Sequence, residues 1–238
     1  MLDTTPIVFV VDDDASARES VEGLMGSAGL RSEVFGSALD FLGRARPCGP
    51  CCLVLDVRLP DLTGLELQAR VAFERNEMPV IFIASCREVA TIVRAMKAGA
   101  LEFLPKPFNA SELLGAVRNA IERSRSILAR EAGLRALRER HSSLTSRERE
   151  VMALVVSGYL NKQVGGELGI SEITVKAHRG RVMRKMQAGS LAHLIDTARR
   201  LGLPLVPKAH AKSGGHAADV TRLSGWGLKA ERHSASAA

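Results

Sequence analysis

Three groups of charged side chains in the chain could together perform phosphoryl chemistry. Asp12, Asp13 and Asp14 follow one apolar run, Asp56 closes a second, and Lys106 follows a third. A carboxylate beside a divalent cation and a lysine can attack a phosphoryl group and hold the resulting aspartyl phosphate. Hard oxygen ligands in small number suit Mg²⁺. An isolated aspartate at a strand end is more often a capping residue, and this is the role we expect for Asp14.

Strand-like and helix-like segments alternate through the first half of the chain and must position these groups. The strands are expected at five runs: Ile7–Val11, Arg31–Phe35, Cys52–Asp56, Val80–Ala84 and Leu101–Leu104. Helix-period stretches follow each run, and the last begins near Asn109. This alternation predicts an α/β domain, a parallel sheet with helices on both faces. Right-handed connections would bring the carboxyl ends of all strands, and with them the charged groups, to one edge.

The residues from Pro6 to about Arg123 resemble the receiver domain of response regulators. The resemblance is carried by the acidic run and by three further motifs: Leu-Asp56-Val-Arg-Leu-Pro60 with Gly64, Met96-Lys-Ala-Gly-Ala100, and Lys106-Pro107-Phe108. It implies a doubly wound, flavodoxin-like fold with a five-stranded parallel sheet. The same fold class follows independently from the alternation of strands and helices.

The resemblance also implies a role for individual residues. Asp56 would be phosphorylated, and Lys106 would pair with the phosphoryl oxygens. Mg²⁺ would be held by four groups: Asp12, Asp13, Asp56 and the backbone carbonyl of Arg58. Phe103 would be the aromatic switch residue that responds to phosphorylation.

One position departs from the receiver pattern and affects the expected switch. Ala84 stands where receivers have a Ser or Thr that bonds the phosphoryl group, 22 residues before Lys106. Ser85 is adjacent, but neighbouring strand side chains point to opposite faces, so it can replace the hydroxyl only if the strand ends or bulges there. We therefore expect Asp56 to be phosphorylated and the coupling of phosphorylation to the rest of the domain to be altered.

Charge is distributed unevenly along the 238 residues, whose net charge is +7. Residues 1–120 carry a net charge of −4, and residues 121–238 carry +11. Such asymmetry indicates two domains, of which the basic one faces a polyanion.

The basic half has the pattern of four short helices. Thr145 and Glu148 form a capping-box sequence, a second helix starts at Asn161, and Ser171 and Ser190 are N-cap candidates for a third and a fourth. The Gly169–Ser171 turn gives the second and third helices the pattern of a helix-turn-helix. On the third helix, Val175, Val182 and Met186 share one arc. The opposite arc holds Lys176, Ala177, Gly180, Arg181 and Arg184, which suits the major groove of DNA.

Residues from His141 to about Leu203 resemble the helix-turn-helix domain of the LuxR/FixJ type. The resemblance is carried by Leu144-Thr-Ser-Arg-Glu-Arg-Glu-Val151, Asn161-Lys-Gln163, Leu168-Gly-Ile-Ser-Glu-Ile-Thr-Val-Lys176 and His178-Arg179. It implies base contacts from Lys176, Ala177 and Gly180. Candidates for phosphate contacts are Thr174, Arg179, Arg181, Arg184 and Lys185. Gly165 and Gly166 depart from the small helix formers expected there, so the second helix is expected to be soft.

These segments predict a domain order. The receiver domain is expected over 1–123, a helical linker over 124–140, the four-helix DNA-binding domain over 141–203 and a disordered tail over 204–238. The chain has 4 cysteines, two of them adjacent, and no run of roughly 18 apolar residues. We expect a cytoplasmic protein without a membrane association.

The combined pattern predicts a response regulator that controls transcription and is not an enzyme. A histidine kinase would phosphorylate Asp56, and the chain would then dimerise or release its basic domain to bind promoter DNA, with RNA polymerase as a further partner. A phosphate-independent DNA-binding regulator, with Ala84 marking a degenerate switch, is the main alternative. A phosphatase using Asp12 and Asp14 would leave the basic half unexplained.

Overall fold

The computed structural model describes residues 5–85 and 88–206 of the chain. The chain folds into two compact units, Met1–Ala132 and Gly133–Ala238. Most of the segment predicted as a disordered tail, 204–238, lies outside the described residues, because these end at Val206.

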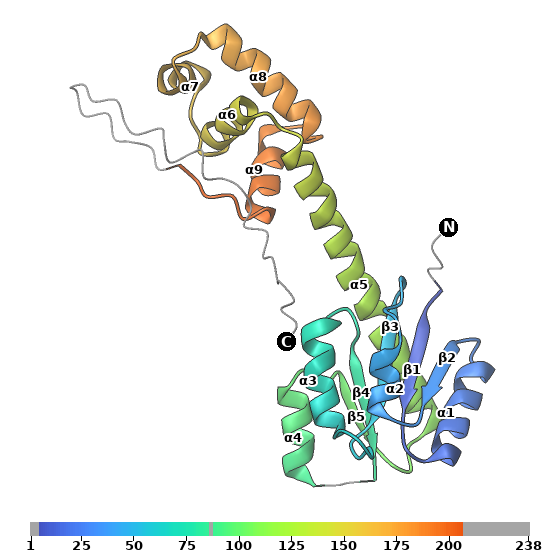
Figure 1. Ribbon diagram of the computed structural model, residues 1–238. Coiled ribbons are helices and arrows are strands. Elements are labelled where there is room, and N and C mark those ends of the chain that lie inside the picture. The colour runs from blue at the N-terminus through green and yellow to red at the C-terminus, as the bar shows by residue number, and fades with distance from the viewer. Residues whose placement is uncertain (1–4, 86–87, 207–238) are drawn as a thin grey trace, which may run out of the picture. The chain divides into compact units, whose positions relative to one another are not determined.

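Five parallel strands form the sheet of the first unit, in the order β2-β1-β3-β4-β5 (Figure 1). The strands are β1 (Ile7–Val11), β2 (Arg31–Phe35), β3 (Cys51–Asp56), β4 (Val80–Ala84) and β5 (Glu102–Pro105). The helices that alternate with them are α1 (Ala15–Ser27), α2 (Ala38–Gly43), α3 (Gly64–Glu74), α4 (Val89–Lys97) and α5 (Ala110–Ser142). The predicted doubly wound parallel fold is confirmed. β3 begins one residue earlier than expected, and β5 is shifted by one residue towards the C-terminus.

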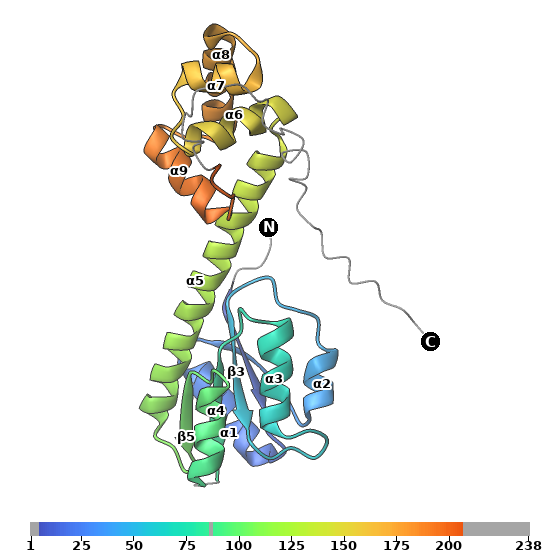
Figure 2. The same cartoon turned by 90° about the vertical axis from the view of Figure 1, so that its left-hand side faces the viewer.

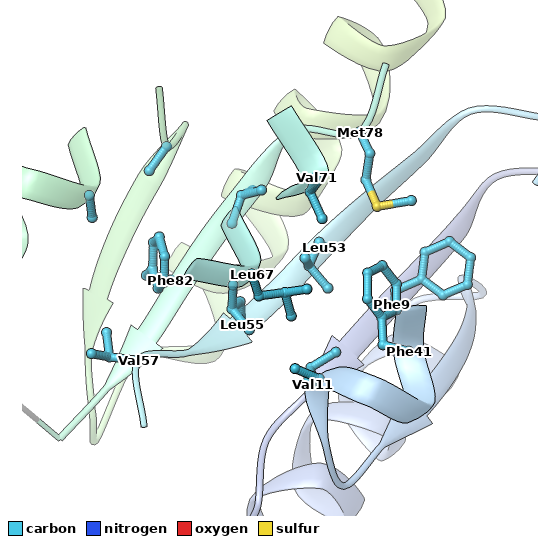
Figure 3. Close-up of a cluster of buried hydrophobic side chains, with 14 of the residues drawn as sticks. Phe9, Val11, Phe41, Leu53, Leu55, Val57, Leu67, Val71, Met78 and Phe82 are labelled. Atoms are coloured by element: carbon cyan, nitrogen blue, oxygen red, sulfur yellow. The ribbon is translucent and has the colours of Figure 1, made fainter. Parts of the chain in front are cut away.

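Alternate strand residues form a separate hydrophobic core on each face of the sheet. Phe9, Leu53 and Phe82 pack with residues of α2, α3 and α4 on one face (Figure 3). Val8 and Val54 pack with residues of α1 and α5 on the other, and Figure 2 shows α3 and α5 on opposite sides of the sheet. Strands buried on both faces account for the nearly continuous apolar runs in the sequence.

The loops at the carboxyl edge of the sheet are held by helix caps. Asp14 accepts hydrogen bonds from the backbone N–H groups of Ser16 and Ala17, so it caps α1 as expected. Thr63 and Glu66 form a capping box at the start of α3. Each cap satisfies donors that the first helical turn leaves free, and its loss typically costs about 1 kcal/mol.

Helix α5 continues past the boundary between the two units. It is 33 residues long and includes all of the stretch 124–140, which was expected to be a helical linker. Its first part is anchored to the sheet by Leu113, Val117 and Ile121 in the core. The buried Ser124 extends this anchor, because its Oγ accepts a hydrogen bond of 3.0 Å from the backbone N–H of Cys51.

The second unit contains the four expected helices after α5: α6 (Ser146–Val156), α7 (Asn161–Leu168), α8 (Glu172–Lys185) and α9 (Leu191–Arg200). Thr145, Ser171 and Ser190 are N-caps of α6, α8 and α9, as predicted. Gly169 ends α7 with φ of 64°, a left-handed conformation that glycine adopts at little cost. Val175, Val182 and other apolar residues of all four helices form one core.

The two adjacent glycines of α7 differ in their surroundings. Gly165 is buried, and a Cβ atom built on it would lie 2.7 Å from the backbone oxygen of Ile170 in the helix-turn-helix turn. Gly166 is exposed, and a Cβ there would meet nothing within 4 Å. Close packing of the turn therefore requires the first glycine, whereas no contact requires the second.

Candidate functional site

The carboxyl edge of the sheet brings Asp12, Asp56 and Lys106 into direct contact. Asp12 follows β1, Asp56 ends the adjacent strand β3, and Lys106 follows β5. The Nζ atom of Lys106 lies 2.5 Å from Asp12 Oδ2 and 2.7 Å from Asp56 Oδ2. Asp12 is fully buried and Asp56 is 8% exposed, so the lysine bridges two carboxylates that are largely withdrawn from water. The predicted convergence of these residues is present in the structure.

A third carboxylate completes a set that suits a small divalent cation. One oxygen from each of Asp12, Asp13 and Asp56 lies within 4.8 Å of the others, and Asp13 is exposed to solvent. Carboxylates with room for water on one side match the preference of Mg²⁺, which keeps several waters when it binds proteins. The three residues thus fit the ion expected from the sequence. The backbone N–H of Arg58 donates to Asp56 Oδ1 at 3.0 Å, which fixes the loop whose carbonyl was predicted as a further ligand.

Burial and ion pairing together set the pKa values of Asp12 and Lys106. Burial raises the pKa of Asp12 and outweighs the hydrogen bonds from Lys106 and from the backbone of Asp14, which lower it. Burial lowers the pKa of Lys106, but its hydrogen bonds to Asp12 and Asp56 raise it by more, so the net pKa lies above the ordinary lysine value. Lys106 therefore carries a positive charge at neutral pH, beside the carboxylate of Asp56.

Two residues that the sequence did not single out hold the loops around the site. The Nη1 atom of Arg18 donates to the backbone oxygens of Asp12 and Asp13, at 2.7 and 3.0 Å. The carboxylate of Asp61 accepts from the backbone N–H groups of Ala38 and Leu39, which ties the loop after β3 to the start of α2. The motif around Asp56 contains no signal for these contacts. Arg18 bonds the loop after β1, and Asp61 bonds the start of α2, and both of these partners lie outside that motif.

Gly64 allows α3 to start close to the phosphoryl-acceptor candidate. A Cβ atom at this position would lie 2.2 Å from the backbone oxygen of Asp56, which is an impossible contact. The backbone N–H of Gly64 also donates to the oxygen of Val57 at 2.8 Å. The glycine of the Asp56 motif therefore serves close packing of the loop.

The three predicted switch residues occupy different environments. Ala84 is the last residue of β4 and is buried, whereas Ser85 follows the strand and is exposed. β4 ends at Ala84, which is the condition stated above for Ser85 to turn its hydroxyl towards Asp56. Phe103 is partly buried and stacks on Phe82, with ring centroids 5.9 Å apart.

In the second unit, α8 presents most of the predicted DNA contacts to solvent. Its buried residues include Val175 and Val182, on the arc expected from the sequence. The exposed set of predicted contacts consists of Thr174, Lys176, Ala177, Gly180, Arg181 and Arg184. This surface is basic, and the residues at Ala177 and Gly180 are small enough to allow close approach of a partner.

The remaining two predicted contacts, Arg179 and Lys185, have partners inside the unit. Arg179 Nη1 donates to Asn161 Oδ1 at 3.1 Å, which joins α8 to the start of α7. Lys185 Nζ lies 2.7 Å from Glu148 Oε2 and 3.1 Å from the backbone oxygen of Ser143. Arg179 therefore joins the two helices of the helix-turn-helix, and Lys185 holds α8 against α6.

Comparison with known families assigns each of the two sites to a domain of known type. Residues 8–118 match the family described as the response regulator receiver domain, and residues 142–198 match the bacterial regulatory proteins of the luxR family. The chain is a response regulator of the FixJ/LuxR type. Its receiver domain contains the acidic site, and its LuxR-type domain contains α8.

Relatives of known name share both domains. Nodulation protein W of Bradyrhizobium diazoefficiens is 48% identical over 200 residues, which cover 84% of this chain and 88% of the relative. The transcriptional regulatory protein FixJ of the same organism is 37% identical over 196 residues, covering 82% and 96%. The solved structure of the response regulator StyR is 43% identical, with a TM-score of 0.75, and the match covers 82% of this chain and 99% of that chain.

This family membership establishes the class of function. The chain is a two-component response regulator with a DNA-binding domain, so DNA and a histidine kinase are its partners as a class, and the family is not a class of enzymes. No comparison favours the alternative of a phosphate-independent regulator. Within residues 5–85 and 88–206, no helix combines the length and apolarity that a membrane span needs.

Proposed function

We propose that this response regulator accepts a phosphoryl group on Asp56 and that phosphorylation controls its binding to promoter DNA. The observation that carries the proposal is the bridge of Lys106 between Asp56 and Asp12, with Asp13 alongside. A structural ion pair alone would not need Asp13 as a third carboxylate beside the two that Lys106 contacts.

The chemistry follows from the atoms at the carboxyl edge. A carboxylate oxygen of Asp56 forms a bond to phosphorus while the bond between phosphorus and the imidazole nitrogen of the kinase breaks. Asp12, Asp13, Asp56 and the backbone carbonyl of Arg58 would hold Mg²⁺, which neutralises charge on the phosphoryl oxygens when bound. Lys106 supplies a fixed positive charge for the same oxygens, at a site largely shielded from water.

Transmission of the signal is proposed to pass through the end of β4 and through β5. Ser85 would supply the hydroxyl that Ala84 lacks, and Phe103 would change its packing against Phe82. Phosphorylation need favour one arrangement of the receiver by only a few kcal/mol to change its population. We further propose that the favoured arrangement forms a homodimer.

The output side of the proposal rests on the basic second half. Base contacts are assigned to Lys176, Ala177 and Gly180. Phosphate contacts are assigned to Thr174, Arg179, Arg181, Arg184 and Lys185. We propose a receiver over 1–123, a linker over 124–140 and a DNA-binding domain over 141–203, acting in the cytoplasm on promoters with RNA polymerase as a partner.

The proposal can be tested with the full chain and a small phosphodonor such as acetyl phosphate. Intact mass with Mg²⁺ should show one added phosphoryl group on the wild type and none on Asp56→Asn. DNA sites selected from a random-sequence pool should bind more tightly after phosphorylation of the wild type only, and binding should weaken steeply with salt.

The outcomes distinguish a regulator that depends on phosphorylation from the phosphate-independent regulator that the sequence also allowed. Equal DNA binding by wild type and Asp56→Asn, with and without phosphodonor, would favour the phosphate-independent alternative. Absence of the added phosphoryl group on the wild type would reject the phosphoryl-acceptor role. Absence of any salt-dependent DNA binding would reject the output role of α8.

A further inference from the structure

The first turn of α8 carries an isoleucine whose side chain is largely exposed. Ile173 is 80% exposed, whereas Val175 and Val182 of the same helix are at most 1% exposed. The turn itself is well held, because Ser171 Oγ accepts from the backbone N–H of Thr174 at 3.1 Å. The side chain of Ile173 thus projects into solvent from a fixed backbone.

The position of Ile173 on the helix places it in the middle of the DNA-facing surface. With 3.6 residues per turn, it lies about 180° from the buried Val182, about 40° from Ala177 and about 20° from Gly180. Ile173, Ala177 and Gly180 therefore form one exposed row, which we call the apolar strip. A Cβ on Gly180 would meet nothing within 4 Å, so nothing in the described part of the domain covers this end of the strip.

Charged side chains border the apolar strip on both sides. Lys176 lies on one side, with an exposed side chain whose ammonium is 3.2 Å from Glu172, and Arg181 lies exposed on the other. A single exposed aliphatic residue needs no explanation by itself. An aliphatic residue between basic side chains, however, suits a partner that presents methyl groups between two rows of negatively charged groups.

Duplex DNA provides this combination in its major groove. Thymine is the base that places a methyl group there, at C5, and apolar side chains contact it. RNA is a poorer match, because the major groove of an A-form helix is too narrow for side chains to read. The phosphates on either side of the groove would meet the basic borders of the strip.

We propose that Ile173 is a specificity-determining residue that contacts the C5 methyl group of a thymine in the major groove. The inference rests on the proposed DNA-binding function and adds a base identity to it. The expected preference is about fourfold in affinity, the value for burying one methyl-sized group.

Replacement of single thymines by deoxyuridine tests this contact, because it removes only the methyl group. A DNA site is first selected from a random-sequence pool with the phosphodonor-treated full chain. For the wild type, one thymine per half-site should show a loss of about fourfold on replacement. Ile173→Ala should bind the thymine site about fourfold more weakly and show no further loss at that position.

Ile195→Ala is a matched control, because Ile195 is also exposed, at 41%, but belongs to α9. It should keep the full thymine preference. The salt dependence of binding should be the same for Ile173→Ala and wild type, since phosphate contacts are retained. Unchanged thermal unfolding would verify that the substitution leaves the fold intact.

A selected site without a thymine that responds, or a thymine preference that persists in Ile173→Ala, would overturn the inference and leave DNA binding in place. Absence of any salt-dependent binding would instead overturn the DNA-binding function, and the inference with it.

Discussion

Lys106 holds its Nζ atom 2.7 Å from Asp56 Oδ2, and the same ammonium reaches Asp12 at 2.5 Å. The lysine side chain is only 18% exposed, and Asp12 is fully buried. The lysine therefore offsets the cost of burying two carboxylates near each other, in addition to its proposed role towards phosphoryl oxygens.

Lys106→Met should destabilise the receiver domain at neutral pH by about 3–5 kcal/mol, because it leaves a buried carboxylate without its cation. The loss should shrink as the pH falls, since the pKa of Asp12 would rise further and the carboxyl group could then be protonated. Urea unfolding of the full chain at several pH values measures this. Lys97→Met, at an exposed position of α4, should have little effect, and equal losses in the two variants would contradict the prediction.

Ser85→Ala should leave phosphorylation of Asp56 intact but reduce the gain in DNA affinity that phosphorylation produces. The physical reason is that β4 ends at Ala84, which frees the exposed Ser85 to offer its hydroxyl to the phosphoryl group. Intact mass and DNA titration with phosphodonor measure the two steps separately. Ser126→Ala, on an exposed turn of α5, is the control. An unchanged response of Ser85→Ala would reject the replacement role.

Gly64→Ala should destabilise the receiver by about 1–3 kcal/mol, because the added methyl group would overlap the backbone oxygen of Asp56. It should also slow phosphorylation by moving the acceptor loop. Gly23→Ala is the control: the residue is exposed within α1, its Cβ would meet nothing within 4 Å, and the change should stabilise by about 0.5–1 kcal/mol. Similar urea midpoints for the two variants would argue against the close packing at Gly64.

Gly165→Ala and Gly166→Ala should change stability in opposite directions. The first forces a methyl group against the backbone oxygen of Ile170 and should cost about 1–3 kcal/mol. The second adds a methyl group in open space and should gain up to about 1 kcal/mol of helix propensity. Thermal unfolding followed by circular dichroism measures both. A loss of stability in Gly166→Ala would show that α7 needs its second glycine for a reason other than packing.

Glu148→Gln should weaken the DNA-binding domain at neutral pH but not at low pH. The hydrogen bond from Lys185, followed by that from the backbone of Thr145, lowers the pKa of Glu148 below 4.5. A carboxylate whose pKa is lowered by folding stabilises the folded state at pH values above its pKa in the unfolded chain. This stabilisation is lost as the pH falls through its pKa in the folded state. Unfolding midpoints of wild type and Glu148→Gln should therefore converge below about pH 4.5. A constant difference down to pH 3 would contradict this assignment.

Much of the acidic site could be predicted because its parts have local signatures. An apolar run that ends on Asp56, an acidic run after β1 and a lysine after β5 are each visible in sequence, and the parallel topology requires their ends to meet. Arg18 and Asp61 could not be found in this way. Their hydrogen bonds reach other loops and helices, and such partners leave no periodic pattern along the chain.

The DNA-binding helix shows the same division. The sequence alone determined the caps at Thr145 and Ser171 and the buried arc of α8, because capping and helical periodicity act within a few residues. Only the tertiary structure decided that Lys185 pairs with Glu148 and that Gly165 must be a glycine. Those features depend on segments brought together by packing of the common core, and their distances are set only when the core has formed.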